Sequence, residues 1–380
     1  MKPHLESRAS CSKMSTPTQD FWNCVPEEIL AHVFSYLPFE DRHTAFQVCQ
    51  RWAVSVSTRP VWSFTEINCN TDDHMNKSCV VQRLPQFLCH ITHLKIVFDQ
   101  LWEVNRRHAA QTLDMLAWQR HRVRALTIVC CGRSPDFYSC QEILYSFRRL
   151  CLTKGKTDFH YIDFRQIPFT LDSRLIRLIA SSNPNLHTLL VNNHPSGIKI
   201  LRPETIVEVL RVCPKLSALG IYHASLSEDV FQELLKPSRG PFLFLDIFCE
   251  GLDRYIPEEL WSALIEKHPQ LRVGLEFGPM VPRWKMSSIL MPNIPIVALQ
   301  FNTFTYMMRE IQYVADSYSR TLERLVLRTI PSDDLNVSLI ELASKCVRLK
   351  EIHCSFAVRQ GVIDAFLLCC RGLTRYTLSM

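Results

Sequence analysis

The side chains best suited to chemistry in this chain are its sixteen cysteines and fourteen histidines. Cys89, His90 and His93 are close in sequence and are residue types that bind zinc, but strand alternation would turn the two histidines to opposite faces. The adjacent thiols lack the two-residue separation of a zinc knuckle; these are Cys130/Cys131 and Cys369/Cys370. We therefore predict no metal site and no cofactor.

A cysteine beside a histidine is also the arrangement of an activated thiol nucleophile, and His353–Cys354 is the most suggestive pair. A thioester-forming cysteine needs an exposed thiol of low pKa near a base or a helix N-terminus. Cys354 instead falls at the inward position of an expected strand, where packing explains it better. The sequence also lacks the phosphate-loop, dinucleotide, nucleophile-elbow and metalloprotease motifs. We predict that the protein is not an enzyme.

With 47% hydrophobic and 21% charged residues, the 380-residue chain has the composition of a folded protein. Residues 1–19 are polar and lack the apolar core of a signal peptide, so we predict a disordered leader there. The sequence has no apolar run long enough for a membrane span, and we expect a cytoplasmic and/or nuclear protein with reduced cysteines. A solvated surface explains the net charge of +6 better than nucleic-acid binding does.

The helices and strands that position the cysteine and histidine side chains are expected to form repeated units. From Phe64 onward, the phrase apolar-x-x-apolar-x-apolar recurs about every 28 residues, a period typical of leucine-rich repeats. About twelve units begin at Phe64, Ile91, Val123, Phe159, Leu186, Leu216, Phe242, Leu271, Ile296, Leu322, Leu349 and Leu373. The unit at Leu271 is out of step because its apolar residues alternate.

Most intervals between the phrases contain an apolar stripe at helical spacing, such as Ile206, Val209 and Leu210. We therefore predict an α/β solenoid over residues 64–380. It should be curved, with parallel strands on the concave face and helices on the convex face. Cys213, Cys346 and Cys370 stand three residues before a phrase, which resembles the cysteine-containing class of leucine-rich repeats. The resemblance implies that these thiols fill the turn from helix to strand.

Residues 25–62 precede the repeats and have signals for short helices. Pro26 suits a first helical turn, an apolar stripe runs from Ile29 to Leu37, and Pro38 should end that helix. A second stripe comprises Ala45, Cys49, Trp52 and Val56, and Trp62 closes the segment. Three short helices cannot enclose this much apolar surface, so a partner should cover part of it. The alternative is that 25–62 is only a helical cap on the larger domain.

This segment resembles the F-box, and the whole chain resembles F-box proteins with leucine-rich repeats. The matching residues are Val25–Leu30 (VPEEIL), Phe34–Pro38 (FSYLP), Asp41, Val48–Trp52 (VCQRW) and Trp62. The resemblance implies a three-helix F-box at 20–63 that binds the S-phase-kinase-associated adaptor of a cullin–RING ubiquitin ligase of the SCF type. The implied adaptor contacts are Val25, Pro26, Ile29, Leu30, Phe34, Leu37, Pro38, Val48, Cys49, Trp52 and Trp62. Two positions depart from the family: Val25 replaces a leucine, and Arg42 places a charge where the family has an apolar anchor.

The repeats should then hold the protein to be tagged. Residues beside the inward strand positions alternate onto the concave face. Exposed aromatic side chains flanked by charges are typical interface anchors. We expect an unidentified protein substrate to contact Arg165, Tyr222, Asp246, Phe248 and Arg328. The alternative is that the two aromatic residues pack against a neighbouring loop.

The leading hypothesis is thus a non-catalytic substrate receptor, working with the adaptor, cullin and RING subunits. A second hypothesis is a leucine-rich-repeat scaffold or inhibitor that acts without the ligase, and Arg42 is the residue that favours it. A third is a self-sufficient cysteine ligase, which predicts a thiol-sensitive ubiquitin adduct on the purified chain.

Overall fold

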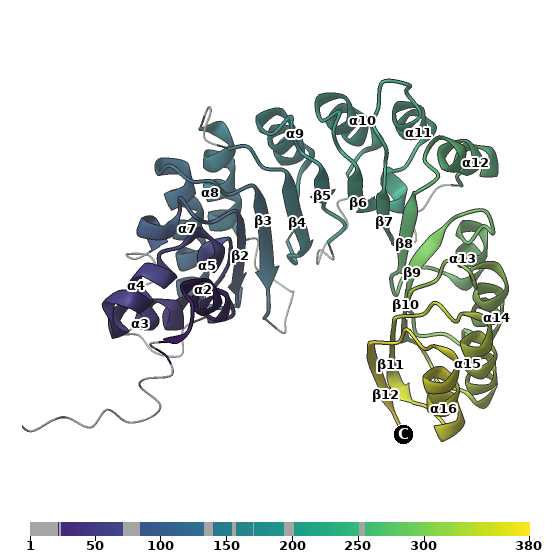
Figure 1. The fold of residues 1–380 in the computed structure, drawn as a ribbon. Helices are drawn as coiled ribbons and strands as arrows, with labels where there is room; N and C mark the ends of the chain where they lie inside the picture. The colour runs from purple at the N-terminus through teal and green to yellow at the C-terminus, as the bar shows by residue number, and fades with distance from the viewer. Residues whose placement is uncertain are drawn as a thin grey trace, which may run out of the picture.

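The computed structural model describes most of the chain, namely residues 22, 24–70, 84–132, 140–153, 157–169, 171–193, 201–250 and 255–380. The described strands form one parallel sheet of twelve strands, ordered β1 to β12 as in the sequence. Figure 1 shows this sheet on the inner face of an arc, with helices along the outer face. The predicted curved α/β solenoid is confirmed. The expected leader, 1–19, lies outside the described residues.

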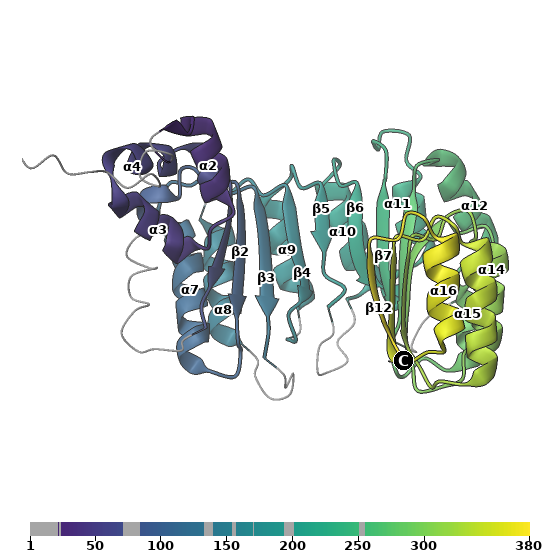
Figure 2. The same cartoon turned by 60° about the horizontal axis from the view of Figure 1, so that its bottom comes forward.

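The chain between Glu27 and Trp62 is helical, and Figure 2 shows these helices at the N-terminal end of the sheet. Pro26 is the N-cap residue of α2 and not its first helical residue, and Pro38 lies beyond the end of α2 as the N-cap residue of α3. The helices are α2 (Glu27–Ser35), α3 (Phe39–Val48), α4 (Gln50–Val56) and the single turn α5 (Arg59–Trp62). The expected continuous stripe through Cys49 is wrong, because Cys49 is extended (φ −160°) and separates α3 from α4.

One strand belongs to each predicted unit. The strands are β1 (Phe64–Asn68), β2 (His93–Phe98), β3 (Ala125–Cys130), β4 (Tyr161–Gln166), β5 (Thr188–Leu190), β6 (Ala218–Tyr222), β7 (Phe244–Cys249), β8 (Arg272–Phe277), β9 (Ile296–Asn302), β10 (Arg324–Arg328), β11 (Glu351–Ala357) and β12 (Arg375–Ser379). The helices of the repeats are α7 (Glu103–Trp118), α8 (Gln141–Leu152), α9 (Ser173–Ser182), α10 (Pro203–Val212), α11 (Glu228–Leu234), α12 (Glu258–Lys267), α13 (Arg283–Ile289), α14 (Met308–Ser317), α15 (Asp333–Lys345) and α16 (Gln360–Cys369), with a 3-10 turn, η1 (His223–Ser225).

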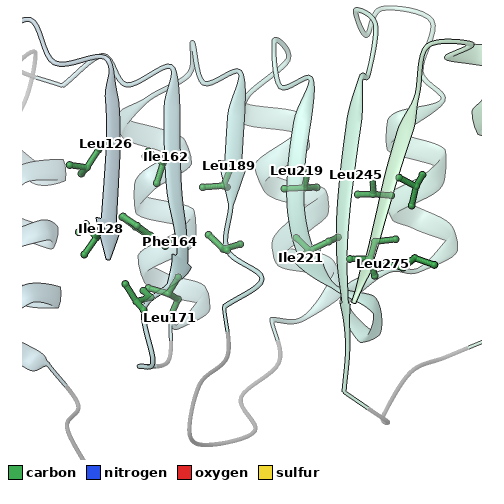
Figure 3. Packing of buried hydrophobic residues seen from close by; sticks show 14 of the residues in the cluster. Leu126, Ile128, Ile162, Phe164, Leu171, Leu189, Leu219, Ile221, Leu245 and Leu275 are labelled. Atoms are coloured by element: carbon green, nitrogen blue, oxygen red, sulfur yellow. The ribbon is translucent and has the colours of Figure 1, made fainter. Parts of the chain in front are cut away.

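The core lies between the sheet and the outer helices. The apolar residues of the strand phrases are buried there in successive units, apart from Phe64 in the first unit and the phrase residues of the last unit. Figure 3 shows Leu126, Ile162 and Leu189 side by side on neighbouring strands. Each unit covers the apolar residues of the next, so stacking supplies the burial that one unit lacks. Among the described residues, no helix combines the length and apolar character that crossing a bilayer requires.

The unit that begins at Leu271 is in register despite its different spacing. Val273 pairs with Leu245, and Leu275 pairs with Ile247, so its apolar residues join the same rows. The mismatch appears at the next strand, where pairing of β8 with β9 shifts between Val273 and Gly274. A local irregularity therefore absorbs the altered spacing without disturbing the core.

The turns from helix to strand contain buried polar side chains. The Cys213 thiol lies 3.5 Å from the carbonyl oxygen of Asn183, and the Cys370 thiol lies 3.5 Å from that of Cys346. His268 occupies the same place in its unit, and its Nδ1 accepts the Phe242 N–H at 3.2 Å. These contacts confirm that the cysteines fill the turns and satisfy backbone groups there.

Candidate functional site

Helix α2 has two apolar faces. Leu30 and Phe34 point into the core and are 0% and 2% exposed. Ile29, Val33 and Tyr36 are 52%, 40% and 77% exposed. Their spacing of four and three places them on one side of the helix. The helix therefore presents an apolar stripe to solvent that the described part of the chain does not cover.

Three residues expected to contact an adaptor are core residues instead. Leu30, Phe34 and Trp62 are buried, so the expectation of direct contact is wrong for them. Trp62 stacks on Phe87 with ring centroids 3.9 Å apart, and its indole N–H donates to the Val56 carbonyl oxygen at 2.7 Å. These side chains bury their apolar area between the short helices and the first repeat. Their burial therefore holds the helices on the solenoid.

The remaining predicted adaptor residues lie at or near the surface. Val25, Leu37 and Trp52 are partly buried against the core. Those that are exposed are Pro26, Ile29, Pro38, Val48 and Cys49. Trp52 makes aromatic contacts with Phe34 and Trp22, at centroid distances of 4.9 and 5.8 Å. Val33 and Tyr36 were missed, although their helical spacing from Ile29 was a signal that could have found them.

Arg42 is buried rather than presented to a partner. Its Nε donates to the Leu37 carbonyl oxygen at 2.9 Å, and its Nη2 donates to that of Ser35 at 2.8 Å. Its Nη1 donates to the carbonyl oxygen of Phe64 in β1 at 3.1 Å. Burial lowers the pKa of the guanidinium group. The expectation that Arg42 places a charge on the docking surface is wrong, because the end of α2 supplies carbonyl groups that draw it inward.

The concave face contains a polar hollow of about 810 Å³. Three of the predicted substrate residues line it: Arg165, Asp246 and Arg328. Arg165 forms ion pairs with Asp163 on its own strand, at 2.8 Å, and with Asp246 on β7, at 3.2 Å. The structure therefore brings together charged groups from β4, β7 and β10.

Two glycines let polar side chains pack closely across the strands of this hollow. Leu190 and Gly220 occupy the sheet positions between Asp163 and Asp246. A Cβ on Gly274, which pairs with Asp246, would lie 2.6 Å from the Asp246 Oδ1, closer than real Cβ atoms approach. A Cβ on Gly220 would likewise lie too close to the Asn192 Oδ1, so both glycines make room for a polar side chain of the preceding unit.

Tyr222 and Phe248 are not exposed anchors, which corrects the prediction for these two residues. They are 4% and 1% exposed. The Tyr222 hydroxyl donates to the Asn193 carbonyl oxygen at 2.9 Å, and burial raises its pKa. The Phe248 ring lies against Gly278, where a Cβ would be 3.2 Å from it. Both residues lie at strand ends, where segments of neighbouring units cover them, so the loop-packing alternative is correct.

The suggestive pair His353–Cys354 is not a catalytic dyad. Cys354 is buried in the core, and burial raises its pKa to about 12. His353 is directed to the other face of β11, where its Nδ1 lies 2.9 Å from the Thr377 hydroxyl and its Nε2 lies 3.0 Å from Glu351. A neutral, enclosed thiol facing away from the imidazole does not act as a nucleophile.

Known proteins are similar to this chain in sequence over nearly its whole length. The F-box-like family model matches residues 22–64. F-box/LRR-repeat protein 8 of Homo sapiens is 33% identical over 360 residues, which cover 94% of this chain and 95% of that protein. The protein of the same name from Mus musculus is 32% identical over the same shares. A chain from the crystal structure of the Rad7 and Elc1 complex in yeast is 12% identical with a TM-score of 0.48, covering 95% of this chain and 83% of that chain.

The relatives match nearly the full length of this chain, through both the N-terminal helices and the repeats. The chain therefore belongs to the family of F-box proteins with leucine-rich repeats, the F-box/LRR-repeat proteins.

Proposed function

We propose that this protein is the substrate-recognition subunit of a cullin–RING ubiquitin ligase of the SCF type. The observation that carries the proposal is the exposed apolar stripe of α2, formed by Ile29, Val33 and Tyr36, on a helix whose opposite face closes the core. An unpaired helical stripe of this kind fits an apolar groove on a partner. Family membership supports the same conclusion.

In this proposal the stripe binds the S-phase-kinase-associated adaptor, and the adaptor connects the protein to the cullin and RING subunits. Contacts extend to the exposed and partly buried residues around the stripe: Val25, Pro26, Leu37, Pro38, Val48, Cys49 and Trp52. The concave hollow, with Arg165, Asp246 and Arg328, holds the target protein. The subunit acts without catalysis or a cofactor, because it accelerates transfer by bringing two proteins together. We place this activity in the cytoplasm and/or nucleus.

The test uses charge substitutions on the exposed stripe. Ile29→Glu and Val33→Glu place a carboxylate in the proposed contact without removing core volume, so each should lower the amount of co-purified adaptor and cullin by about thirtyfold or more. Val337→Glu is the matched control, since Val337 is 62% exposed on the distant helix α15. Unchanged adaptor recovery with either stripe variant would refute the proposal.

The alternative, a scaffold or inhibitor acting without the ligase, depended on Arg42. Arg42 faces the core, so its charge does not weaken the exposed stripe. Point variants separate the two hypotheses better than deletion of residues 21–62 would. Deletion removes Trp62 from its stack on Phe87 and uncovers the first repeat. A target whose lifetime is unaffected by Val33→Glu would favour the scaffold.

A further inference from the structure

A second groove lies on the outer side of the solenoid, away from the concave hollow. It is a cavity of about 620 Å³ between α13 and α14, which Figure 1 shows as neighbours on the helical face of the arc. Its lining includes Arg283, Trp284 and Leu290 from the α13 side, and Arg309, Glu310 and Tyr313 from α14. Nothing in the proposed recognition of adaptor or target uses these residues.

The groove is held open by contacts at both of its ends. At the start of α13, Arg283 forms a two-point ion pair with Glu310, and the Nη2 to Oε2 distance is 2.9 Å. Beyond the end of α13, the Tyr313 hydroxyl donates to the Leu290 carbonyl oxygen at 3.1 Å. Because both ends of the helix are fixed to α14, a ligand would find the groove already formed.

The groove combines an exposed tryptophan with an apolar floor. Trp284 is 74% exposed, whereas Leu290, which also lines the cavity, is 3% exposed. Met280, Phe304 and Tyr306 are further exposed apolar side chains in the segments just before α13 and α14, outside the lining of the cavity. Tryptophan, tyrosine and arginine are the residue types most enriched at binding hot spots. This composition is typical of surfaces that bind other proteins.

The charges around the groove determine which charge a ligand should have. Glu310 is buried and is neutralised by Arg283. Arg309 is exposed and forms no ion pair among the described residues. The groove therefore has an uncompensated positive charge beside its apolar surface. A complementary ligand has carboxylates next to an apolar side chain.

We propose that the groove between α13 and α14 binds a short acidic peptide segment of another protein. An apolar side chain of the segment packs between Trp284 and Leu290, and a neighbouring carboxylate pairs with Arg309. Arginine suits this role because its planar fork can donate two parallel hydrogen bonds to one carboxylate. The site is separate from the proposed adaptor and target surfaces, so it gives the protein a further point of attachment.

The experiment measures binding to the full-length protein by fluorescence anisotropy. The probes are fluorescein-labelled peptides with the same central leucine–phenylalanine pair, flanked by glutamate, by serine or by lysine. We expect the glutamate peptide to bind about tenfold or more tightly than the other two. Trp284→Ala should weaken its binding about thirtyfold, and Arg309→Glu should reverse the preference toward the lysine peptide.

Trp102→Ala is the matched control, because Trp102 is 66% exposed on a different unit and should leave peptide binding unchanged. Equal affinity for the glutamate and lysine peptides overturns the proposal, as does absence of binding up to about 1 mM peptide. Sedimentation with phosphatidylserine vesicles tests the competing ligand. Vesicle binding that requires Trp284, without peptide binding, assigns the groove to an anionic membrane surface and also overturns the proposal.

Discussion

The guanidinium carbon of Arg42 lies 5.4 Å from the centroid of the Trp62 ring. This contact places a charged side chain between the N-terminal helices and β1, where its N–H groups donate to carbonyl groups on both sides. Arg42 is thus a structural link between the F-box helices and the solenoid. Because the guanidinium group points inward, its charge does not lie on the exposed apolar stripe of α2.

Replacement of Arg42 by leucine should destabilise this protein. Leucine leaves the carbonyl oxygens of Ser35, Leu37 and Phe64 without their donor, and we expect a loss of about 2–3 kcal/mol in the free energy of unfolding. Chemical denaturation measures this loss. Arg59→Leu at an exposed position is the control, with an expected change within about 0.5 kcal/mol. Weaker adaptor binding at full stability would instead place Arg42 in the interface.

His268 should make the protein sensitive to acid. Its burial lowers the pKa of the imidazole, and the neutral ring accepts the Phe242 N–H at Nδ1 while its Nε2 lies 3.1 Å from the Leu234 carbonyl oxygen. In the unfolded chain the pKa returns to about 6.5. The unfolded state then binds more protons than the native state, so this contribution to stability is complete above that pH and is lost as the pH falls.

The acid sensitivity is measured by the melting temperature as a function of pH. His268→Asn should reduce the loss of stability on acidification below about pH 6.5, because asparagine does not titrate there. Asparagine is a fair replacement: Asn183 fills the corresponding turn, and its Oδ1 accepts the Phe159 N–H at 2.9 Å. An identical pH profile for the variant and the natural protein would contradict this prediction.

The cysteines should differ strongly in reactivity. Burial raises the pKa of Cys213 to about 11 and that of Cys354 to about 12, whereas Cys49 and Cys89 are exposed. In the folded protein at about pH 8, iodoacetamide should modify the exposed pair about a hundredfold faster, as read by mass spectrometry. The denatured chain is the control and should lose this difference. Rapid modification of Cys354 in the folded protein would revive the cysteine-ligase hypothesis.

Charge reversal on the concave face should remove the target and keep the adaptor. Arg328 is exposed at the end of β10 and lines the hollow, so Arg328→Glu changes the potential there without disturbing the core. Affinity purification with the proteasome blocked should recover normal adaptor and several-fold less of the target proteins. Arg165→Gln should have a similar effect, with a stability loss of at most about 1 kcal/mol because the guanidinium is partly exposed.

For these concave-face variants, the adaptor recovered in each sample is the internal standard. An unchanged set of target proteins with both variants would show that targets are held elsewhere on the solenoid. Loss of the adaptor together with the targets would point to misfolding, and unchanged melting temperatures exclude that explanation.

The repeat was predictable in detail because the buried positions of a strand recur in the sequence. Leu94 and Ile96 could be assigned to the core from spacing alone, and both are fully buried. The helical stripe at Ile29, Leu30, Val33 and Phe34 was equally visible. The sequence did not show which of these residues face the core and which face solvent, because four apolar residues in one arc of a helix can be buried or exposed.

The amino-acid sequence by itself determined the solenoid, the helices that precede it and the family, because local periodicity and residue order carry that information. Tertiary structure decided which apolar residues remain exposed and where individual polar groups point. The Arg42 side chain points inward because carbonyl groups of α2 and β1 accept its N–H groups. Tyr222 can be buried because its hydroxyl donates to the Asn193 carbonyl oxygen. Such choices depend on partners far along the chain, which spacing within one segment does not reveal.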